Sequence, residues 1–132
     1  MLALAACGTS ASRREEAALT EYLPYTGAPI EEFHYFRLDG WQSLGDDRVV
    51  IWTSPSDAYM VTVEGPCTEL GFTNRLGITS TFGTVSHFEA LLVRGGQRCP
   101  IKEIRPINVK QLNADRAAER AERAKARAAE QH

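Results

Sequence analysis

Seven side chains of this sequence could act as acids, bases or metal ligands. They are His34, Asp39, Asp46, Asp47, Asp57, His87 and Glu89. The aspartates lie beside glycine or proline in segments typical of turns, where a carboxylate hydrogen-bonds the local backbone. The histidines lie in aromatic runs, and the sequence contains no nucleophile elbow, phosphate loop or His-Glu-x-x-His motif. We therefore predict no catalytic residue, no metal site and no cofactor. The alternative is a small hydrolase or metal-handling protein that uses His34, His87 and nearby acids.

Two of the three cysteines, Cys67 and Cys99, fit an oxidised pair. Small domains outside the cytoplasm use disulfides to supplement a limited core. Closing a loop of this length stabilises a fold by about 3–4 kcal/mol in the chain-entropy model. The alternative is a metal site in which these thiols join His34 or His87, but the two cysteines lack close ligand spacing. The disulfide is the favoured interpretation.

The third cysteine, Cys7, ends the segment Leu4-Ala5-Ala6-Cys7 and is followed by Gly8. This is the pattern of a bacterial lipobox, in which the chain is cut before the cysteine and lipid is attached to it. An export signal needs a basic region and about 7–15 apolar residues before the cut. Because residues 1–6 provide neither, we expect the true start to lie upstream. The alternative is an incidental cysteine near a frayed terminus.

The charge pattern argues against nucleic acid as a partner. The formal net charge is −2, and residues 33–113 carry eight basic and eight acidic side chains. Phosphate backbones are bound by concentrated positive charge, which no region of this chain shows. The sequence also lacks an apolar run of the roughly 20 residues that a membrane-spanning helix requires.

Four aromatic side chains are candidates for a surface or groove: Tyr35, Trp41, Trp52 and Tyr59. The alternative is ordinary core, because aromatic rings supply much of the buried area of a small domain. The core interpretation is favoured, since a sheet of this size encloses little interior volume for a ligand.

The middle of the chain is typical of short strands separated by turns. Beta-branched and aromatic runs alternate with Gly, Pro, Asp and Ser. The expected strands are residues 33–38, 48–53, 58–63, 76–80, 85–93 and 99–106. The second and third strands form a predicted hairpin around Pro55. Because the last strand contains Pro100 and Pro106, it is expected to lie at the edge of the sheet or to have these prolines at its ends. About six strands predict a mainly β fold, a small antiparallel barrel or sandwich.

The flanks of the chain are predicted to be helical. A short helix is expected over residues 12–23, and Asn108 is expected to cap a second helix in which Val109 and Leu112 dock the first turn. Beyond Leu112 the helix is rich in alanine and charge, so it is expected to be exposed to solvent or to dock on a partner. The predicted divisions are a signal segment (1–7), a tether (8–32), a β domain (33–107) and a helical tail (108–132).

Several motifs occur together in one order along the chain. They are Trp41-x-x-Leu44-Gly45-Asp46, Val50-x-Trp52-Thr53, Ala58-Tyr59, Gly65-Pro66-Cys67-x-x-Leu70-x-Phe72, Ile78-Thr79-Ser80 and Cys99-x-Ile101-x-x-Ile104-Arg105-Pro106. Over residues 24–110 the chain resembles a family of small Gram-negative lipoproteins that share a domain of unknown function. The resemblance implies an N-terminal lipobox, a mostly β domain and a Cys67–Cys99 bridge. It implies no enzymatic activity.

Together these features predict a non-enzymatic binding or structural module of the cell envelope. Lipid on Cys7 would hold it to a membrane, with the domain facing the periplasm and the outer membrane as the expected location. An envelope protein that contacts the C-terminal helix is the expected partner.

Overall fold

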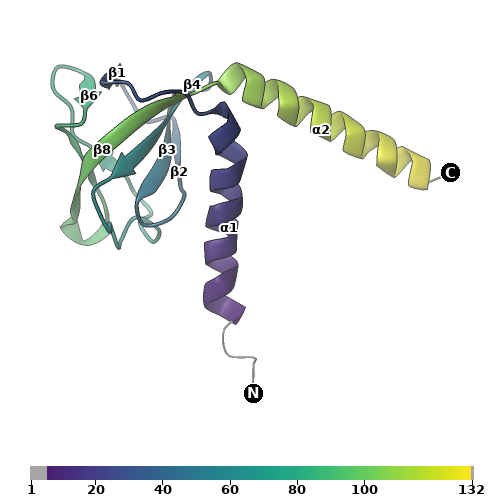
Figure 1. Cartoon of the computed structure of the whole chain (residues 1–132), viewed down its shortest axis with the longest axis horizontal. Coiled ribbons are helices and arrows are strands. Elements are labelled where there is room, and N and C mark those ends of the chain that lie inside the picture. Colours follow the sequence, from purple (N-terminus) through teal and green to yellow (C-terminus); the bar gives the residue numbers. More distant parts are fainter. Residues whose placement is uncertain (1–5, 132) are drawn as a thin grey trace.

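The computed structural model describes residues 6–131, with side chains from residue 13 onward. Over this range, eight strands form two sheets flanked by two helices (Figure 1). The six-stranded sheet has the order β2 (Gly40–Ser43), β3 (Arg48–Ser54), β4 (Asp57–Val63), β8 (Arg98–Ile107), β7 (Ala90–Leu92) and β5 (Gly77–Ile78). The second sheet pairs β1 (Glu32–His34) with β6 (Thr84–Ser86). The larger sheet curls into a half-barrel, so the predicted mainly β fold with helical flanks is confirmed.

The hairpin of β3 and β4 agrees with its prediction. Its strands pair antiparallel, with Val49 opposite Val61 and Ile51 opposite Tyr59. The turn around Pro55 is closed by the Ser54 hydroxyl, which donates a 2.8 Å hydrogen bond to Asp57. Successive strand residues point to opposite faces, which is why the two faces of this hairpin contribute to different parts of the core.

Three predicted strands need correction, and one strand was not predicted. The strand expected over 76–80 is reduced to β5 (Gly77–Ile78). The segment after Asp39 forms β2 at the sheet edge instead of a turn, and the strand expected over 33–38 ends at His34. The strand expected over 85–93 is divided into β6 and β7. Between them Ser86 forms a turn, because its hydroxyl accepts from the Phe88 N–H and its carbonyl accepts from the Glu89 N–H. Local hydrogen bonds of this kind compete with the strand ladder.

Strand β8 lies inside the sheet, between β4 and β7, so it is not an edge strand. The other prediction, that Pro100 and Pro106 lie near the ends of the strand, is correct. Proline lacks an N–H donor and interrupts a ladder of hydrogen bonds. Pro100 and Pro106 do not interrupt the ladder, because the hydrogen-bonding side of each faces a residue outside the strands. Their carbonyls accept from the N–H of Glu64, just beyond β4, and of Gly27.

The core consists of two clusters on opposite faces of β3 and β4. The inner cluster fills the curl of the half-barrel and includes Val49, Ile51, Val61, Leu70, Val85, Leu91 and Ile104. The outer cluster lies under the helices and includes Tyr22, Val50, Met60, Val109 and Leu112. Alternating residues of β3 thus contribute to both clusters, with Val49 and Ile51 in the inner cluster and Val50 in the outer cluster.

Helix α1 ends and helix α2 begins at the same end of the sheet; α1 runs beside the β domain, and α2 projects away from it (Figure 1). Helix α1 (Ala6–Tyr22) is longer than expected and continues into the 3-10 turn η1 (Leu23–Tyr25). A second 3-10 turn, η2 (Arg94–Gly96), precedes β8. Helix α2 (Val109–Glu130) starts as predicted, because the Asn108 side chain accepts a 3.1 Å hydrogen bond from the Gln111 N–H. No helix within residues 6–131 has the length and apolar character needed to cross a membrane.

Candidate functional site

The two histidines lie apart on the small sheet. His34 ends β1 opposite Thr84, whereas His87 follows the last residue of β6, and both side chains are exposed. Glu89 accepts a 3.3 Å hydrogen bond from Thr81. Among the side chains that the structure describes, from residue 13 to residue 131, no three His, Cys, Asp or Glu are grouped so that they could hold a metal ion. This arrangement gives no support to a hydrolase or metal-handling site built on the histidines.

The predicted turn aspartates serve the backbone of the fold. Asp57 closes the β3–β4 turn, and the N–H of Asp39 donates to the Trp52 carbonyl. The segment before β3 contacts the end of β4 and the loop after it. The carbonyls of Asp46 and Asp47 accept hydrogen bonds from the N–H groups of Cys67 and Val63, respectively. Asp57 thus uses its carboxylate to close a turn, whereas Asp39, Asp46 and Asp47 make these contacts through their backbone atoms.

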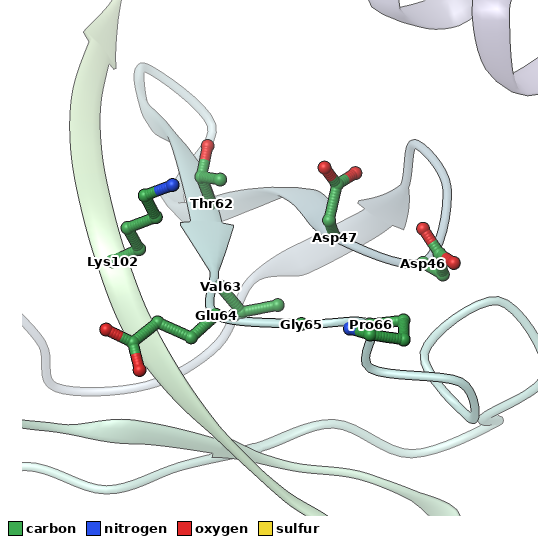
Figure 2. A pocket seen from close by; sticks show the side chains of 8 residues that line it. All are labelled: Asp46, Asp47, Thr62, Val63, Glu64, Gly65, Pro66 and Lys102. Carbon is green, nitrogen blue, oxygen red and sulfur yellow. The ribbon is translucent and has the colours of Figure 1, made fainter.

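A polar depression lies at the end of β4, with a volume of about 560 Å³. Figure 2 shows the carboxylates of Asp46, Asp47 and Glu64 and the amine of Lys102 around it. Its remaining lining residues are Thr62, Val63, Gly65 and Pro66. Small-molecule sites are mostly apolar and enclosed. This depression is instead charged and open, with an excess of negative charge that favours cationic groups.

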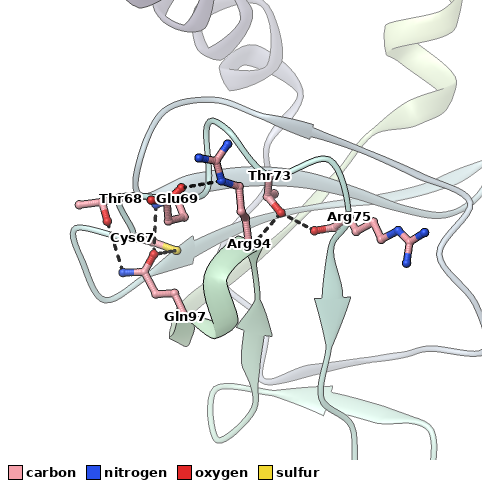
Figure 3. Close-up of polar contacts among 7 residues, drawn as sticks. All are labelled: Cys67, Thr68, Glu69, Thr73, Arg75, Arg94 and Gln97. Carbon is pink, nitrogen blue, oxygen red and sulfur yellow. Dashed lines mark hydrogen bonds and ion pairs between the residues drawn. The ribbon is translucent and has the colours of Figure 1, made fainter.

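The disulfide joins Cys67 and Cys99, whose side chains are buried. It confirms the predicted pair and rules out the alternative in which these two thiols bind a metal. Figure 3 shows the polar network around it. The Gln97 side-chain carbonyl accepts a 3.1 Å hydrogen bond from the Glu69 N–H, and Glu69 forms a 3.4 Å ion pair with Arg94. The same network includes Thr73, whose hydroxyl donates to the Arg75 carbonyl and accepts from the Arg94 N–H.

The four candidate groove aromatics do not share one surface. Tyr35, Trp41 and Tyr59 are half-buried against the inner cluster, and the Tyr59 ring stacks on Phe33 with centroids 4.4 Å apart. Burial raises the pKa of the Tyr59 hydroxyl above its ordinary value. Trp52 points to the opposite face and packs against the outer cluster. All four side chains are half-buried at the margins of the two core clusters, on different faces of the sheet, so they form no single groove.

A polar junction joins α1 to α2. The guanidinium of Arg116 donates to one carboxylate oxygen of Glu21, with Nη2 at 2.8 Å and Nε at 3.0 Å. Its carbon atom also lies 5.5 Å from the centroid of the Tyr22 ring, which places the cation over the aromatic face. Arg116 thus binds a carboxylate and a ring on a neighbouring helix at the same time.

The side chains of helix α2 from residue 114 onward form three rows along the helix. With 3.6 residues per turn, positions three and four apart lie along one face. We define the arginine row as Arg116, Arg120, Arg123 and Arg127, the alanine row as Ala114, Ala117, Ala121, Ala124 and Ala128, and the acidic row as Asp115, Glu119, Glu122 and Glu130. All residues from 117 to 130 are exposed. Sequence reasoning missed the rows, although their regular spacing is the signal that finds them.

The comparisons with known proteins place the chain in one family. The model of a family of unknown function, DUF6491, matches residues 1–123. The chain belongs to this family. No curated protein and no solved structure matches it. A family of unknown function agrees with the resemblance drawn from the sequence, while lipid attachment and Gram-negative origin stay predictions.

The DUF6491 match includes the β domain, the junction and most of α2. It also includes Cys7, which falls within the bounds of α1, but the side chain of Cys7 lies outside the described residues. The predicted lipid site is therefore argued from the sequence pattern alone.

A second contact at the junction of this DUF6491 member predicts a pH dependence. The Tyr25 hydroxyl and the Gln111 amide donate to Asp115 and hold the pKa of its carboxyl below the ordinary value of 3.8. A lowered folded-state pKa stabilises the fold above the ordinary pKa, and this contribution is lost as the pH falls through the folded-state value. Carboxyl NMR titration should therefore show Asp115 titrating below its ordinary value, and Tyr25→Phe, which removes the hydroxyl donor, should raise its midpoint. An Asp115 midpoint that is the same in the wild type and in Tyr25→Phe would contradict the contact.

Proposed function

We propose that this chain is a lipid-anchored, non-enzymatic module of the bacterial cell envelope that faces the periplasm and binds or supports another envelope protein. The observation that carries the proposal is the buried disulfide. Disulfides persist in oxidising compartments and are rare in the cytosol. The Cys67–Cys99 bond also accounts for two of the three cysteines and leaves Cys7, in Leu4-Ala5-Ala6-Cys7, for lipid attachment.

The direction of α1 fits this role. The helix runs toward the N-terminus beside the β domain (Figure 1), and its Glu15 carboxylate lies near Gly45 and Gly71. Its last turns pack on the outer cluster through Ala18, Leu19 and Tyr22. A lipid on Cys7 would therefore lie on the part of the helix that extends beyond these contacts, about 12 Å from Glu15 at 1.5 Å per residue. Firm attachment requires several acyl chains, which a triacylated cysteine supplies.

The test is lipid labelling in a Gram-negative host that expresses the gene with its upstream reading frame. Cells are fed an alkyne fatty acid, and the recovered protein is read out by coupling to a fluorophore. We expect a labelled membrane protein whose label disappears in Cys7→Ser, because serine cannot form the thioether. The matched control is the double variant Cys67→Ser and Cys99→Ser, which should keep the label. Label that survives in Cys7→Ser, or wild-type chain without label, would reject the anchor.

A further inference from the structure

A single residue, Asn108, connects the last strand of the sheet to α2. Strand β8 ends at Ile107, and the helix begins at Val109. Residues 117–130 are all exposed, so about 20 Å of the helix, at 1.5 Å per residue, is not packed against the β domain. A terminal segment of this kind moves freely unless contacts at its base hold it. The contacts in the first two turns therefore decide the direction of α2.

One line of contacts runs along a single face of these two turns. Val109 and Leu112 are buried in the outer cluster. Arg116 follows one turn later, where it binds the Glu21 carboxylate and lies over the Tyr22 ring. Positions 109, 112 and 116 have the spacings of three and four that place side chains on one face of a helix. This line holds the base of α2 against α1 and the sheet, but alone it would let the helix roll.

A second line of contacts lies on an adjoining face of α2 and is made by Tyr25 of η1. The Tyr25 carbonyl accepts a 2.7 Å hydrogen bond from the Asn108 N–H, and the Tyr25 hydroxyl donates to Asp115. The Gln111 amide donates to the same carboxylate at 2.8 Å. With 3.6 residues per turn, positions 111 and 115 lie roughly 110° around the helix from the first line. Contacts on two faces fix both the tilt and the rotation of the helix.

The residues that receive α2 are themselves fixed to the β domain. Tyr22 is buried, and its hydroxyl donates a 3.0 Å hydrogen bond to the Gln42 side chain of β2. The chain just after Tyr25 is bound to β8, because the Gly27 N–H donates a 2.8 Å hydrogen bond to the Pro106 carbonyl. The base of α2 therefore rests on the sheet at two places, through α1 at β2 and through η1 at β8.

We propose that this junction is a latch that fixes the direction of α2, so that residues 117–130 project as a rigid arm and do not swing as a loose tail. The latch consists of two contacts, which are the Arg116 guanidinium on Glu21 and Tyr22 and the Tyr25 hydroxyl on Asp115. Side chains of the arm thus keep a set position relative to the β domain. This inference goes beyond the proposed function and is independent of lipid attachment.

The test is a distance measurement by double electron–electron resonance on the oxidised full chain. Nitroxide labels are attached at Lys102→Cys, an exposed position of β8, and at Ala128→Cys on the arm. A Cys7→Ser background leaves only these two thiols free to react. We expect one narrow distance distribution for the labelled chain with an intact latch. Residue 128 lies about 18 Å beyond Arg116, so a swing of about 30° would move its label by about 9 Å.

Opening the latch should release the arm. We expect the double variant Arg116→Ala and Tyr25→Phe to broaden the distance distribution about twofold or more, because the arm then pivots on its docked first turn. The matched control, Arg123→Ala with Tyr35→Phe, makes the same chemical changes away from the junction and should leave the distribution narrow. Alanine favours a helix at least as well as arginine does, so neither variant weakens α2 itself.

A charge exchange separates the latch from a general loss of structure. Arg116→Glu alone sets two carboxylates against each other and should broaden the distribution. Adding Glu21→Arg restores an ion pair of reversed polarity and should narrow the distribution again. Helical content, measured by circular dichroism, should be the same in every variant.

Five results would overturn the inference. They are a broad distribution with the latch intact, a narrow one in the double variant, equal broadening in the matched control, no narrowing on charge exchange, and loss of helical content in the double variant. The last would mean that the contacts form the helix and do not direct it. The labelled chain carries no lipid, so these results stand apart from the fatty-acid labelling of Cys7.

Discussion

Replacing Cys67 and Cys99 together by alanine is expected to lower the free energy of unfolding by about 3–4 kcal/mol. The bond closes a loop between residues 32 apart in sequence. Breaking that loop releases entropy in the unfolded chain, and small domains have only about 5–15 kcal/mol of stability in total. Both side chains are buried, so the substitutions also remove sulfur atoms from the inner cluster. Urea titration of the wild type and the double variant measures the difference.

The third cysteine provides the control for this experiment. Cys7→Ala leaves the bridge intact and should change the free energy of unfolding by less than about 0.5 kcal/mol. Reducing agent should shift the wild-type transition toward that of the double variant and should leave the double variant where it is. A loss below about 1 kcal/mol would mean that the reduced, unfolded chain already holds the two segments together, contrary to the entropic account.

The parts of the fold that follow from local chemistry were predictable. The β3–β4 hairpin carries its signal in a beta-branched run on each side of Pro55, and α2 carries its signal in the Asn108 cap. Each depends on residues close in sequence. The bridge between Cys67 and Cys99 was predictable for another reason, because compartment and cysteine number limit the pairings.

The parts that failed depend on distant partners or on competing local bonds. β2 is short and forms through its pairing with β3. Its own sequence contains no run of beta-branched residues that would predict a strand. The prolines of β8 left open whether this strand lies at an edge or inside the sheet, because its own sequence does not reveal that loops face both of them. The division of β6 from β7 follows from the Ser86 turn, a local signal hidden inside an apolar run.

The candidate surface shows the same division. The exposure of α2 could be predicted from its alanine content, because no residue beyond Leu112 on its apolar side is larger than alanine. The role of Arg116 could not, since its partners Glu21 and Tyr22 lie about 95 residues away and become neighbours only through the fold.

Replacing Ile51 by alanine is expected to lower the free energy of unfolding by about 2–5 kcal/mol, and by valine about 0.5–1.5 kcal/mol. The side chain is fully buried, with 0% exposure, between Trp41 on β2 and Tyr59 on β4. Truncation to alanine removes buried methyl groups and leaves a cavity that the paired strands cannot collapse. Urea titration measures both variants, and Lys102→Ala, at an exposed position in β8, is the matched control within about 0.5 kcal/mol.

The difference in cost between Ile51→Val and Ile51→Ala tests whether Trp41 and Tyr59 pack against the core or line a groove. If Trp41 and Tyr59 are core side chains, their rings are fixed by Ile51 and by the Phe33 stack, so the cost rises with the volume removed. If the rings instead left Ile51 open to water, its methyl groups would already be solvated in the folded chain, and both variants would cost less than about 1 kcal/mol. A steep series would therefore mean that Trp41 and Tyr59 help to shield Ile51 from water and so stabilise the half-barrel.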